Sequence, residues 1–280
     1  GTDLRVKNRR ARVKIQTLPG ADIATFKDGM SELDPVVLAA PILADGLNSV
    51  AFSAAKNDAR MHLNGVFVEP HEGELCFTAT NGHRLATYAL PDIEADFEPM
   101  ILPNAAVQDL IKLCERNKET DLSLFVNDSM LRVESSQEAY QTKLLEGTFP
   151  AWRRIWPKDS ATQAMLTIAP ASFEAAVRLV SATDTTKTPS VGFRGSGDVV
   201  DLQSDDPDSE AVDRIDAKVE GSEQFVFLNS AYLLDALSRM PRAAGRITIT
   251  DSATPVRFEA EGHRLRQVVT PLRGRGEWAS

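Results

Sequence analysis

Apolar positions recur with helical spacing in four segments of the chain. Spacings of three and four residues predict helices near 42–56, at 105–116, near 171–181 and from Tyr232 onward. The positions that would face a core are, in chain order, Leu43, Leu47, Val50 and Ala54; Val107, Leu110, Ile111 and Cys114; Phe173, Ala176, Val177 and Val180; and Leu233, Ala236, Leu237 and Met240. Each apolar stripe needs a partner surface, so the helices are expected to pack on sheets or on one another.

Strand pairs with turn residues between them follow these helices. NGVFVEP and ELCFTATN follow the first helix, and SVGFRGSGDVVDLQSD follows the third. SLFVNDSMLRV at 123–133 and ITITDSATPVRF at 247–258 are typical of strand–turn–strand units, in which Asp, Asn and Ser supply the turn. The pattern predicts an α+β fold with antiparallel sheets and argues against a parallel α/β fold.

The two halves of the chain also repeat each other. LPNAAVQDLIKL at 102–113 resembles FLNSAYLLDAL at 227–237, which aligns Asn104 with Asn229 at an offset of 125. Asp128–Ser129 aligns with Asp251–Ser252 at an offset of 123. Asn104 and Asn229 are both predicted to be helix N-caps. Each unit of about 125 residues therefore runs helix, strands, helix, strands.

Two segments lie outside this repeat. The polar stretch PKDSATQ at 157–163 is the predicted boundary between the units. Near the N-terminus, residues 4–15 alternate as a hairpin with Asn8 near the turn, and six of residues 5–14 are Lys or Arg. A two-stranded hairpin is barely stable alone in water. We therefore expect it to end a larger unit or to pack on another chain.

Composition narrows the protein class. The chain has 280 residues, of which 42% are hydrophobic, and a formal net charge of −9. It is long enough for about two domains and has no apolar run that would span a membrane. Two cysteines, Cys76 and Cys114, and the lack of an apolar signal core at the start favour a cytoplasmic location. The acidic balance argues against a simple basic coat for nucleic acid, but it permits basic residues gathered on one surface.

No catalytic or cofactor motif is found. The phosphate loop, the dinucleotide fingerprint, zinc spacings and the nucleophile elbow are all absent, and the four histidines are scattered. The acidic stretch 198–223 is expected to be a solvated loop and strand rim. Asp205, Asp206 and Asp208 suggest calcium, but the glycine and the glutamate of an EF-hand loop are missing. We therefore expect a binding or scaffold protein with no metal or cofactor, and not an enzyme.

Basic residues lie away from the predicted cores of all four helices. They are Lys56, Lys112, Arg116, Arg178, Arg239 and Arg242. On any single helix this is what an ordinary charged outer face looks like. Across repeated units, the same placement predicts one basic surface that contacts phosphates without reading bases.

Several segments resemble the bacterial DNA polymerase III beta subunit, the sliding clamp family. They span nearly the whole chain in the family's order: TLPGADIATF (17–26), AAKNDARMHLNGVFVE (54–69), ATNGHRLA (79–86), LLEGTFPAWRRIWP (144–157), NSAYLLDAL (229–237), TDSATPVRF (250–258) and QVVTPLR (267–273). The resemblance implies the DNA clamp fold, with two helices of each domain on an inner face and antiparallel sheets outside.

The resemblance also implies a domain division. Residues 1–30 correspond to the final hairpin and linker of a first clamp domain, 31–157 to the middle domain, 158–274 to the C-terminal domain and 275–280 to a tail. In the family, the first domain pairs with the last domain of a second subunit and closes a six-domain ring. Because most of that domain is missing here, ring closure by a homo-oligomer stays open, with a trimer of two-domain chains as an alternative.

Two functional surfaces follow from the resemblance. A peptide-binding pocket is implied by Leu63, Thr80, Gly82, His83, Arg84, Leu85, Pro150, Arg154, Ile155, Asn229, Tyr232, Pro255, Val268, Val269, Pro271, Leu272 and Arg273. Contact with duplex DNA is implied for Lys56, Asn57, Arg60, Lys112, Arg116, Arg178 and Arg239. Taken alone, Leu63, Leu85 and Ile155 would be read as core residues.

The sequence departs from the family pattern at a few positions. Asn81 stands where the family usually has Asp, and Thr270 and Leu272 replace two methionines. GRGEWAS follows Arg273, and its Trp278 would either cover the pocket or belong to a disordered tail.

Two hypotheses about function remain. The first is a non-catalytic processivity factor that contacts DNA and recruits DNA polymerase and clamp-loader subunits through hydrophobic linear motifs. The second is a clamp-like adaptor that binds the same peptides without encircling DNA. A hydrolase has no positive support, and no membrane partner is expected.

Overall fold

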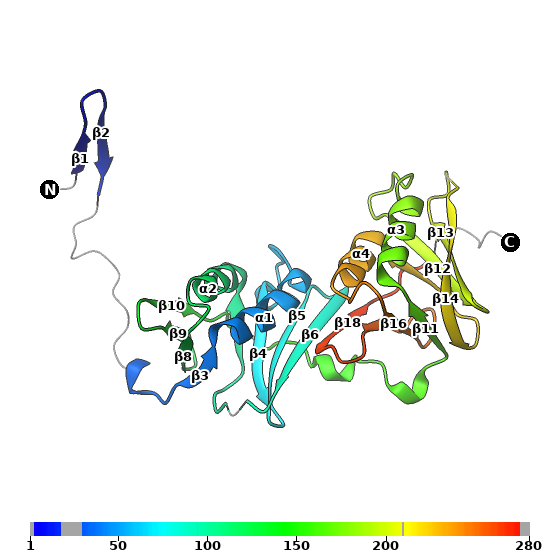
Figure 1. The fold of residues 1–280 in the computed structure, drawn as a ribbon, viewed down its shortest axis with the longest axis horizontal. Coiled ribbons are helices and arrows are strands. Elements are labelled where there is room, and N and C mark those ends of the chain that lie inside the picture. The colour runs from blue at the N-terminus through cyan, green and yellow to red at the C-terminus, as the bar shows by residue number, and fades with distance from the viewer. Residues whose placement is uncertain (1–2, 18–29, 94, 209, 275–280) are drawn as a thin grey trace. The chain divides into compact units, whose positions relative to one another are not determined.

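The computed structural model describes residues 3–17, 30–93, 95–208 and 210–274, and it divides the chain into two units, residues 1–34 and 35–280. The smaller unit carries a hairpin of β1 (Asp3–Lys7) and β2 (Arg12–Gln16) (Figure 1). Asn8 Oδ1 accepts hydrogen bonds from the backbone N–H groups of Arg10 and Ala11 at 2.9 and 2.8 Å. The predicted hairpin and its turn are confirmed, whereas most of the predicted linker and the tail 275–280 with Trp278 lie outside the described residues.

The larger unit contains two successive repeats. We call residues 36–143 repeat A and residues 164–269 repeat B. The elements of repeat A are β3 (Val36–Ala39), α1 (Ala40–Val50), β4 (Gly65–His71), β5 (Glu74–Thr80), β6 (Arg84–Pro91), β7 (Met100–Pro103), α2 (Asn104–Arg116), β8 (Asp121–Val126), β9 (Met130–Glu134) and β10 (Ala139–Lys143). Those of repeat B are β11 (Ala164–Ile168), α3 (Pro170–Ser181), β12 (Ser190–Ser196), β13 (Val199–Ser204), β14 (Val212–Gly221), β15 (Phe225–Asn229), α4 (Ser230–Ser238), β16 (Gly245–Ile249), β17 (Val256–Glu259) and β18 (Leu265–Val269).

The described strand pairs are all antiparallel, as the sequence predicts. One sheet has four strands in the order β10-β9-β8-β3. A second, in the same unit, has twelve strands in the order β15-β12-β13-β14-β11-β16-β17-β18-β6-β5-β4-β7, and the β1–β2 hairpin forms a separate two-stranded sheet. The two repeats meet where β18 pairs with β6, with Val269 opposite Arg84 and Leu265 opposite Tyr88. This junction brings the residues just before β6 next to repeat B.

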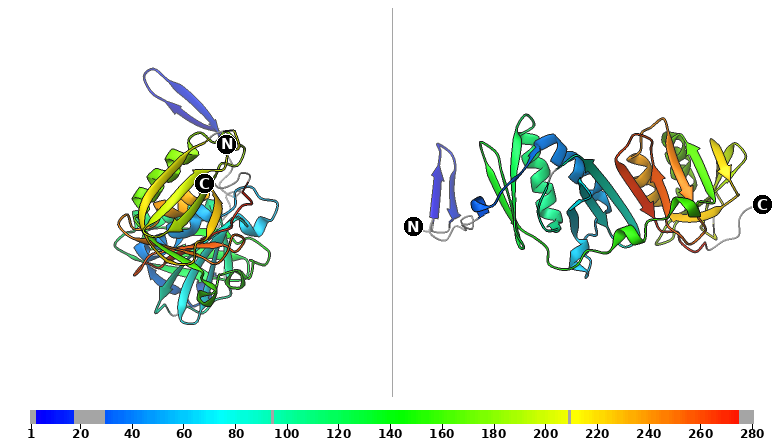
Figure 2. Two further views of the ribbon diagram at one scale, coloured as in Figure 1. Left: turned by 90° about the vertical axis from the view of Figure 1, so that its right-hand side faces the viewer. Right: turned by 90° about the horizontal axis from the view of Figure 1, so that it is seen from below.

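The helices lie on the sheets in pairs. α1 packs beside α2 and on β5 and β6, while α3 packs beside α4 and on β12, β13 and β14. Figures 1 and 2 show the four helices in the order α2, α1, α4, α3 along the larger unit. Every residue of the predicted core stripes is buried. Two of them, Ala54 and Met240, lie just beyond the ends of the observed helices but are still buried. The α+β prediction is therefore confirmed.

Some predicted helix ends are wrong. α1 ends at Val50 and is followed by a 3-10 turn, Ala51–Ser53, so Lys56 lies in a loop and not on the helix. α2 begins at Asn104 itself, with Pro103 at the cap position, and the Asn104 side chain instead donates to the Ala55 carbonyl at 2.7 Å.

At the start of α4, by contrast, the N-cap prediction is confirmed. Asn229 Oδ1 accepts from the backbone N–H of Tyr232 at 3.1 Å. The two asparagines thus lie one position apart relative to their helices, although they align in sequence.

Two predictions about polar segments are also corrected. In repeat A the turn before β9 is held by Asn127, whose Oδ1 accepts from the backbone N–H groups of Ser129 and Met130, so Asn127 and not Asp128 corresponds to Asp251. In the acidic stretch, Asp205 and Asp206 are buried and not solvated. Asp205 accepts from the Ser190 hydroxyl at 2.8 Å, and Asp206 accepts from a loop N–H, so both carboxylates serve the fold.

The described residues of the larger unit form three apolar clusters. One lies in repeat A, one lies in repeat B, and the third joins residues of both. The third comprises Ala55, Leu63, Leu85, Ile101, Phe149, Trp152 and Val268. Among the described helices, none is long and apolar enough to cross a membrane.

Candidate functional site

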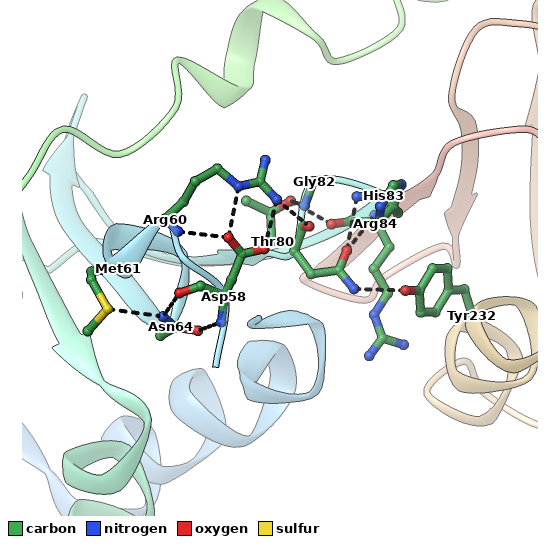
Figure 3. A network of polar contacts seen from close by, with 10 residues as sticks. Asp58, Arg60, Met61, Asn64, Thr80, Gly82, His83, Arg84 and Tyr232 are labelled. Carbon is green, nitrogen blue, oxygen red and sulfur yellow. Dashed lines mark hydrogen bonds and ion pairs between the residues drawn. The ribbon is translucent and has the colours of Figure 1, made fainter. Parts of the chain in front are cut away.

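The turn Thr80–Arg84, between β5 and β6, is held by its own side chains. Asn81 Oδ1 accepts from the backbone N–H groups of His83 and Arg84 at 2.9 and 3.1 Å. The Thr80 hydroxyl donates to the Arg84 carbonyl at 2.6 Å and accepts from the Gly82 N–H at 3.1 Å. Gly82 has a φ of 89°, which favours glycine at this point. The turn is thus cross-linked by its own hydrogen bonds, and His83 within it is exposed at the junction of the repeats (Figure 3).

Arg84 crosses that junction. Its guanidinium forms an ion pair with Asp235 on α4 and donates to the carbonyl of Phe52, which follows α1. Its Cζ lies 5.2 Å from the ring centroid of Phe52 and 4.6 Å from that of Tyr232. Only 12% of the Arg84 side chain is exposed. One cation therefore holds three elements together, with attraction to two aromatic faces in a partly desolvated place.

Tyr232 completes the junction from the side of repeat B. Its hydroxyl lies 3.2 Å from the Asn81 side-chain nitrogen, and its ring stacks near His83 with a centroid separation of 6.4 Å. The Thr270 N–H donates to the His83 carbonyl at 2.9 Å, which continues the β18–β6 pairing into the turn. Residues from three distant parts of the sequence thus converge around one turn.

Arg60 supports the turn from the opposite side. It forms a two-point ion pair with Asp58, with Nε and Nη2 at 3.0 and 2.9 Å from the carboxylate oxygens. The same guanidinium donates to the Asn81 carbonyl at 3.3 Å and lies against Gly82, whose missing Cβ would be 3.2 Å from it. This pairing holds the pKa of Asp58 well below its usual range. Arg60, expected to contact DNA, therefore has its charge paired and its head group beside the turn.

A groove of about 900 Å³ lies in repeat A beside the loop that carries Lys56, Asn57 and Asp58. Its lining includes Lys56, Asn57 and Asp58 from the loop, Met61 and Asn64, and Asn104 and Gln108 from α2. Asp58 and Asn64 are tied together by two hydrogen bonds between the Asn64 amide and the Asp58 backbone, at 2.9 and 2.8 Å. The segment that presents Lys56 and Asn57 to solvent is thus held in one shape.

The residues expected to form the peptide pocket fall into three classes of burial. Buried are Leu63, Thr80, Leu85, Val268 and Val269. Partly buried are Arg84, Asn229, Tyr232, Pro255, Pro271 and Leu272, and exposed are Gly82, His83, Pro150, Arg154, Ile155 and Arg273.

Several of these residues are brought together. Leu63, Leu85 and Val268 share one apolar cluster with Trp152, and Trp152 belongs to the short 3-10 helix that also contains Arg154. The buried members can therefore support a ligand surface from beneath, while the exposed side chain of Ile155, 52% accessible, is available to a ligand.

The residues expected to contact DNA differ in how free their charges are. Lys56, Asn57 and Lys112 are exposed, and among the described residues no ion pair is formed by either lysine. Arg116 makes two hydrogen bonds to Glu138, at 2.9 and 2.7 Å, and Arg178 pairs with Glu174 one helical turn away. Arg239 lies over the Phe52 ring, with Cζ 5.0 Å from the centroid.

Sequence reasoning missed three partners in this site. Phe52 contributes both a carbonyl and a ring, and nothing in its local pattern marks it. Asp58 precedes Arg60 by two residues, so a local ion pair was foreseeable from spacing. Asp235 lies three residues after Tyr232 on α4, and this helical spacing places both on one face.

Comparison with known proteins identifies the family of the chain. The family model for the central domain of the DNA polymerase III beta subunit matches residues 38–151, and that for its C-terminal domain matches residues 153–273. The beta sliding clamp of Salmonella typhimurium is 30% identical over 98% of this chain and 74% of its own length. That of Escherichia coli K12 is 28% identical, again over 74% of its length.

Solved structures show the same fold. The DNA polymerase III subunit beta of Pseudomonas aeruginosa superposes with a TM-score of 0.88 at 24% identity, over 97% of this chain and 74% of that one. The Caulobacter crescentus pol III beta superposes with a TM-score of 0.87 at 25% identity, over the same shares. Two family models covering most of the chain, and clamp structures covering nearly all of it, show that this chain belongs to the bacterial DNA polymerase III beta subunit family, the sliding clamps of DNA replication.

Proposed function

We propose that the chain acts in DNA replication as a non-catalytic clamp subunit with two working surfaces. One contacts duplex DNA without reading its sequence, and the other binds short hydrophobic motifs of DNA polymerase, clamp-loader subunits and other partners. The observation that carries the proposal is the junction itself, where two motifs separated by 151 residues, at Asn81 and Tyr232, meet through a hydrogen bond.

The junction has the features that suit a short peptide. The turn Thr80–Arg84 is rigid, Tyr232 and His83 offer aromatic faces, and Ile155 offers an exposed apolar side chain. Peptide sites combine apolar surface with a few fixed polar groups that orient the ligand. The Tyr232 hydroxyl, held by Asn81, supplies such a group, while the cluster of Leu63, Leu85 and Val268 lies buried.

Charge placement supports the DNA surface. The chain as a whole is acidic, with a formal net charge of −9, yet Lys56 and Lys112 are exposed without an ion pair among the described residues. Positive side chains that meet only phosphates give binding that is independent of sequence and sensitive to salt. The surface would therefore hold DNA and leave base recognition to partners.

Peptide binding is tested with a synthetic peptide that carries a Gln-Leu-hydrophobic motif. We expect saturable binding by the wild-type chain and a loss of at least about ten-fold in affinity for Tyr232→Ala, which removes an anchoring aromatic side chain. Tyr140→Ala removes another partly buried tyrosine away from the junction and serves as the matched control. Equal loss in both variants, or no loss in either, would move the site elsewhere.

DNA binding is tested by retention on closed circular and on linear duplex of the same length, with the oligomeric state measured alongside. Longer retention on the circle, together with a closed oligomer, supports encirclement. Equal retention on both forms by a chain that still binds the peptide supports the non-ring adaptor.

A further inference from the structure

The orientation of the Asn81 amide is fixed by its surroundings. Its Oδ1 accepts from two backbone N–H groups, those of His83 and Arg84, at 2.9 and 3.1 Å. An amide nitrogen carries only donors and could not occupy that position. The –NH₂ group therefore faces the other way, and there it meets the Tyr232 hydroxyl oxygen at 3.2 Å.

The orientation of the Asn81 amide decides whether the Tyr232 hydroxyl can donate a hydrogen bond to a ligand. Because the Asn81 amide donates to the phenolic oxygen, the hydroxyl hydrogen points away from Asn81. A carboxylate at position 81 could make the same two backbone contacts, but it would accept the hydroxyl hydrogen and leave only an acceptor exposed. With Asn at position 81 the Tyr232 hydroxyl can donate a hydrogen bond to a ligand, whereas with Asp at that position it could only accept one.

The hydroxyl is also well positioned to meet a ligand. The Tyr232 ring lies against the Arg84 guanidinium, whose Cζ is 4.6 Å from its centroid, and near the roughly parallel His83 ring at 6.4 Å. Tyr232 is partly exposed, and His83 beside it is exposed. Figure 3 shows the Tyr232 ring at one end of the network, and its hydroxyl contacts the Asn81 amide.

We propose that Asn81 is a positioning residue that turns the Tyr232 hydroxyl into a hydrogen-bond donor, so that the junction selects a carbonyl oxygen of the bound peptide. The inference deepens the proposed peptide site and rests on it for the identity of the ligand. The orientation of Asn81 itself stands on the contacts within the chain.

The test compares wild type, Asn81→Asp, Tyr232→Phe and the double variant for binding of the Gln-Leu-hydrophobic peptide. Asp keeps both backbone contacts of the turn, so the fold is expected to be preserved. Each single variant should weaken binding about five-fold, the loss expected for one neutral hydrogen bond. The double variant should bind as Tyr232→Phe does, because the hydroxyl through which position 81 acts is already gone. If Asn81→Asp weakens binding equally in the wild-type and the Tyr232→Phe chain, the added charge and not the hydroxyl is responsible, and the inference is overturned. Wild-type affinity in both single variants would also overturn it.

A second measurement needs no peptide. The side-chain amide resonances of Asn81, observed by NMR with ¹⁵N labelling, should shift in Tyr232→Phe because they lose their acceptor. Unshifted resonances would overturn the inference whether or not the peptide binds. A wild-type chain that shows the shift but binds no peptide would instead refute the proposed function and the selection of a carbonyl.

The source of the carbonyl is distinguished by a peptide in which Met replaces Gln. If the glutamine side chain supplies it, Asn81→Asp should have no effect on this second peptide. If the peptide backbone supplies it, the effect should be retained.

Discussion

The guanidinium of Arg84 lies over the ring of Tyr232, with 4.6 Å between Cζ and the ring centroid, and this contact joins repeat A to repeat B. The same guanidinium is paired with Asp235 and donates to the Phe52 carbonyl. Arg84 is therefore a largely buried structural link between the repeats, and it lies directly beside Tyr232 of the proposed peptide site.

Replacing Arg84 by Met should destabilise the larger unit by about 2 kcal/mol, because a partly desolvated hydrogen-bonded charge is removed and the Phe52 carbonyl loses its donor. The measurement is urea unfolding at neutral pH. Asp235→Asn is the control, and it should cost less than about 1 kcal/mol because the Asp235 side chain is 49% exposed. Similar losses in both variants would show that the ion pair alone carries the effect.

The sequence predicts the helices well because their core residues follow a strict period. Val107, Leu110, Ile111 and Cys114 are all buried on α2, as the spacing of three and four residues requires. Helix ends are less predictable, because capping depends on which residue takes the non-helical conformation. Asn229 caps α4, whereas Asn104, at the aligned position, begins α2.

The site was predictable only in part for a related reason. The turn Thr80–Arg84 is held by contacts among neighbours in sequence, so its residues carry a local signal. Its partner Phe52 comes from another element of repeat A, and its contact with Arg84 depends on how α1 and the turn after it pack on β6. Tyr232 comes from repeat B, and its contact with the turn depends on how β18 pairs with β6. Periodicity does not determine such a register, so only the resemblance placed Tyr232 near this turn.

A pH effect is expected at the turn between β16 and β17. Asp251 accepts from the N–H groups of Ala253 and Thr254 and from the Thr254 hydroxyl, and these bonds lower the pKa of its carboxyl below the usual 3.8. A lowered pKa in the folded state stabilises the fold above the unfolded pKa, and that contribution is lost as pH falls through the folded value. Asp251→Asn should therefore be less stable than wild type at pH 7, with the difference shrinking as the pH falls below the usual pKa of an aspartate.

The corresponding turn in repeat A provides the control. Asn127 makes the same kind of backbone contacts without a titratable group. The destabilisation by Asn127→Ala, measured by urea unfolding over the same pH series, should stay constant. If the destabilisation by Asp251→Asn is also constant over the pH series, the Asp251 carboxylate does not cause the pH dependence.

Free and paired cations should differ in DNA binding. Lys112 forms no ion pair among the described residues, whereas Arg116, one helical turn further along α2, is held by Glu138. Lys112→Gln should reduce the slope of log affinity against log salt by about 0.9, the value for one lost phosphate contact with duplex DNA. Arg116→Gln should change it less, because the arginine must leave Glu138 to reach a phosphate. Equal changes in the two variants would show that the Glu138 pair does not restrain Arg116.

Arg60 should act on peptide binding and not on DNA, because its guanidinium is paired with Asp58 and supports Asn81 and Gly82. Arg60→Gln is expected to weaken peptide binding roughly five-fold through loss of that support, with the salt dependence of DNA binding unchanged. Asp58→Asn is the decisive companion variant, since it keeps Arg60 and frees its charge. If Arg60 supports the turn, Asp58→Asn weakens peptide binding as Arg60→Gln does. If Arg60 contacts phosphate, Asp58→Asn strengthens DNA binding and leaves the peptide affinity unchanged. The two roles thus predict opposite responses to one substitution, measured by peptide titration and by DNA binding across a salt series.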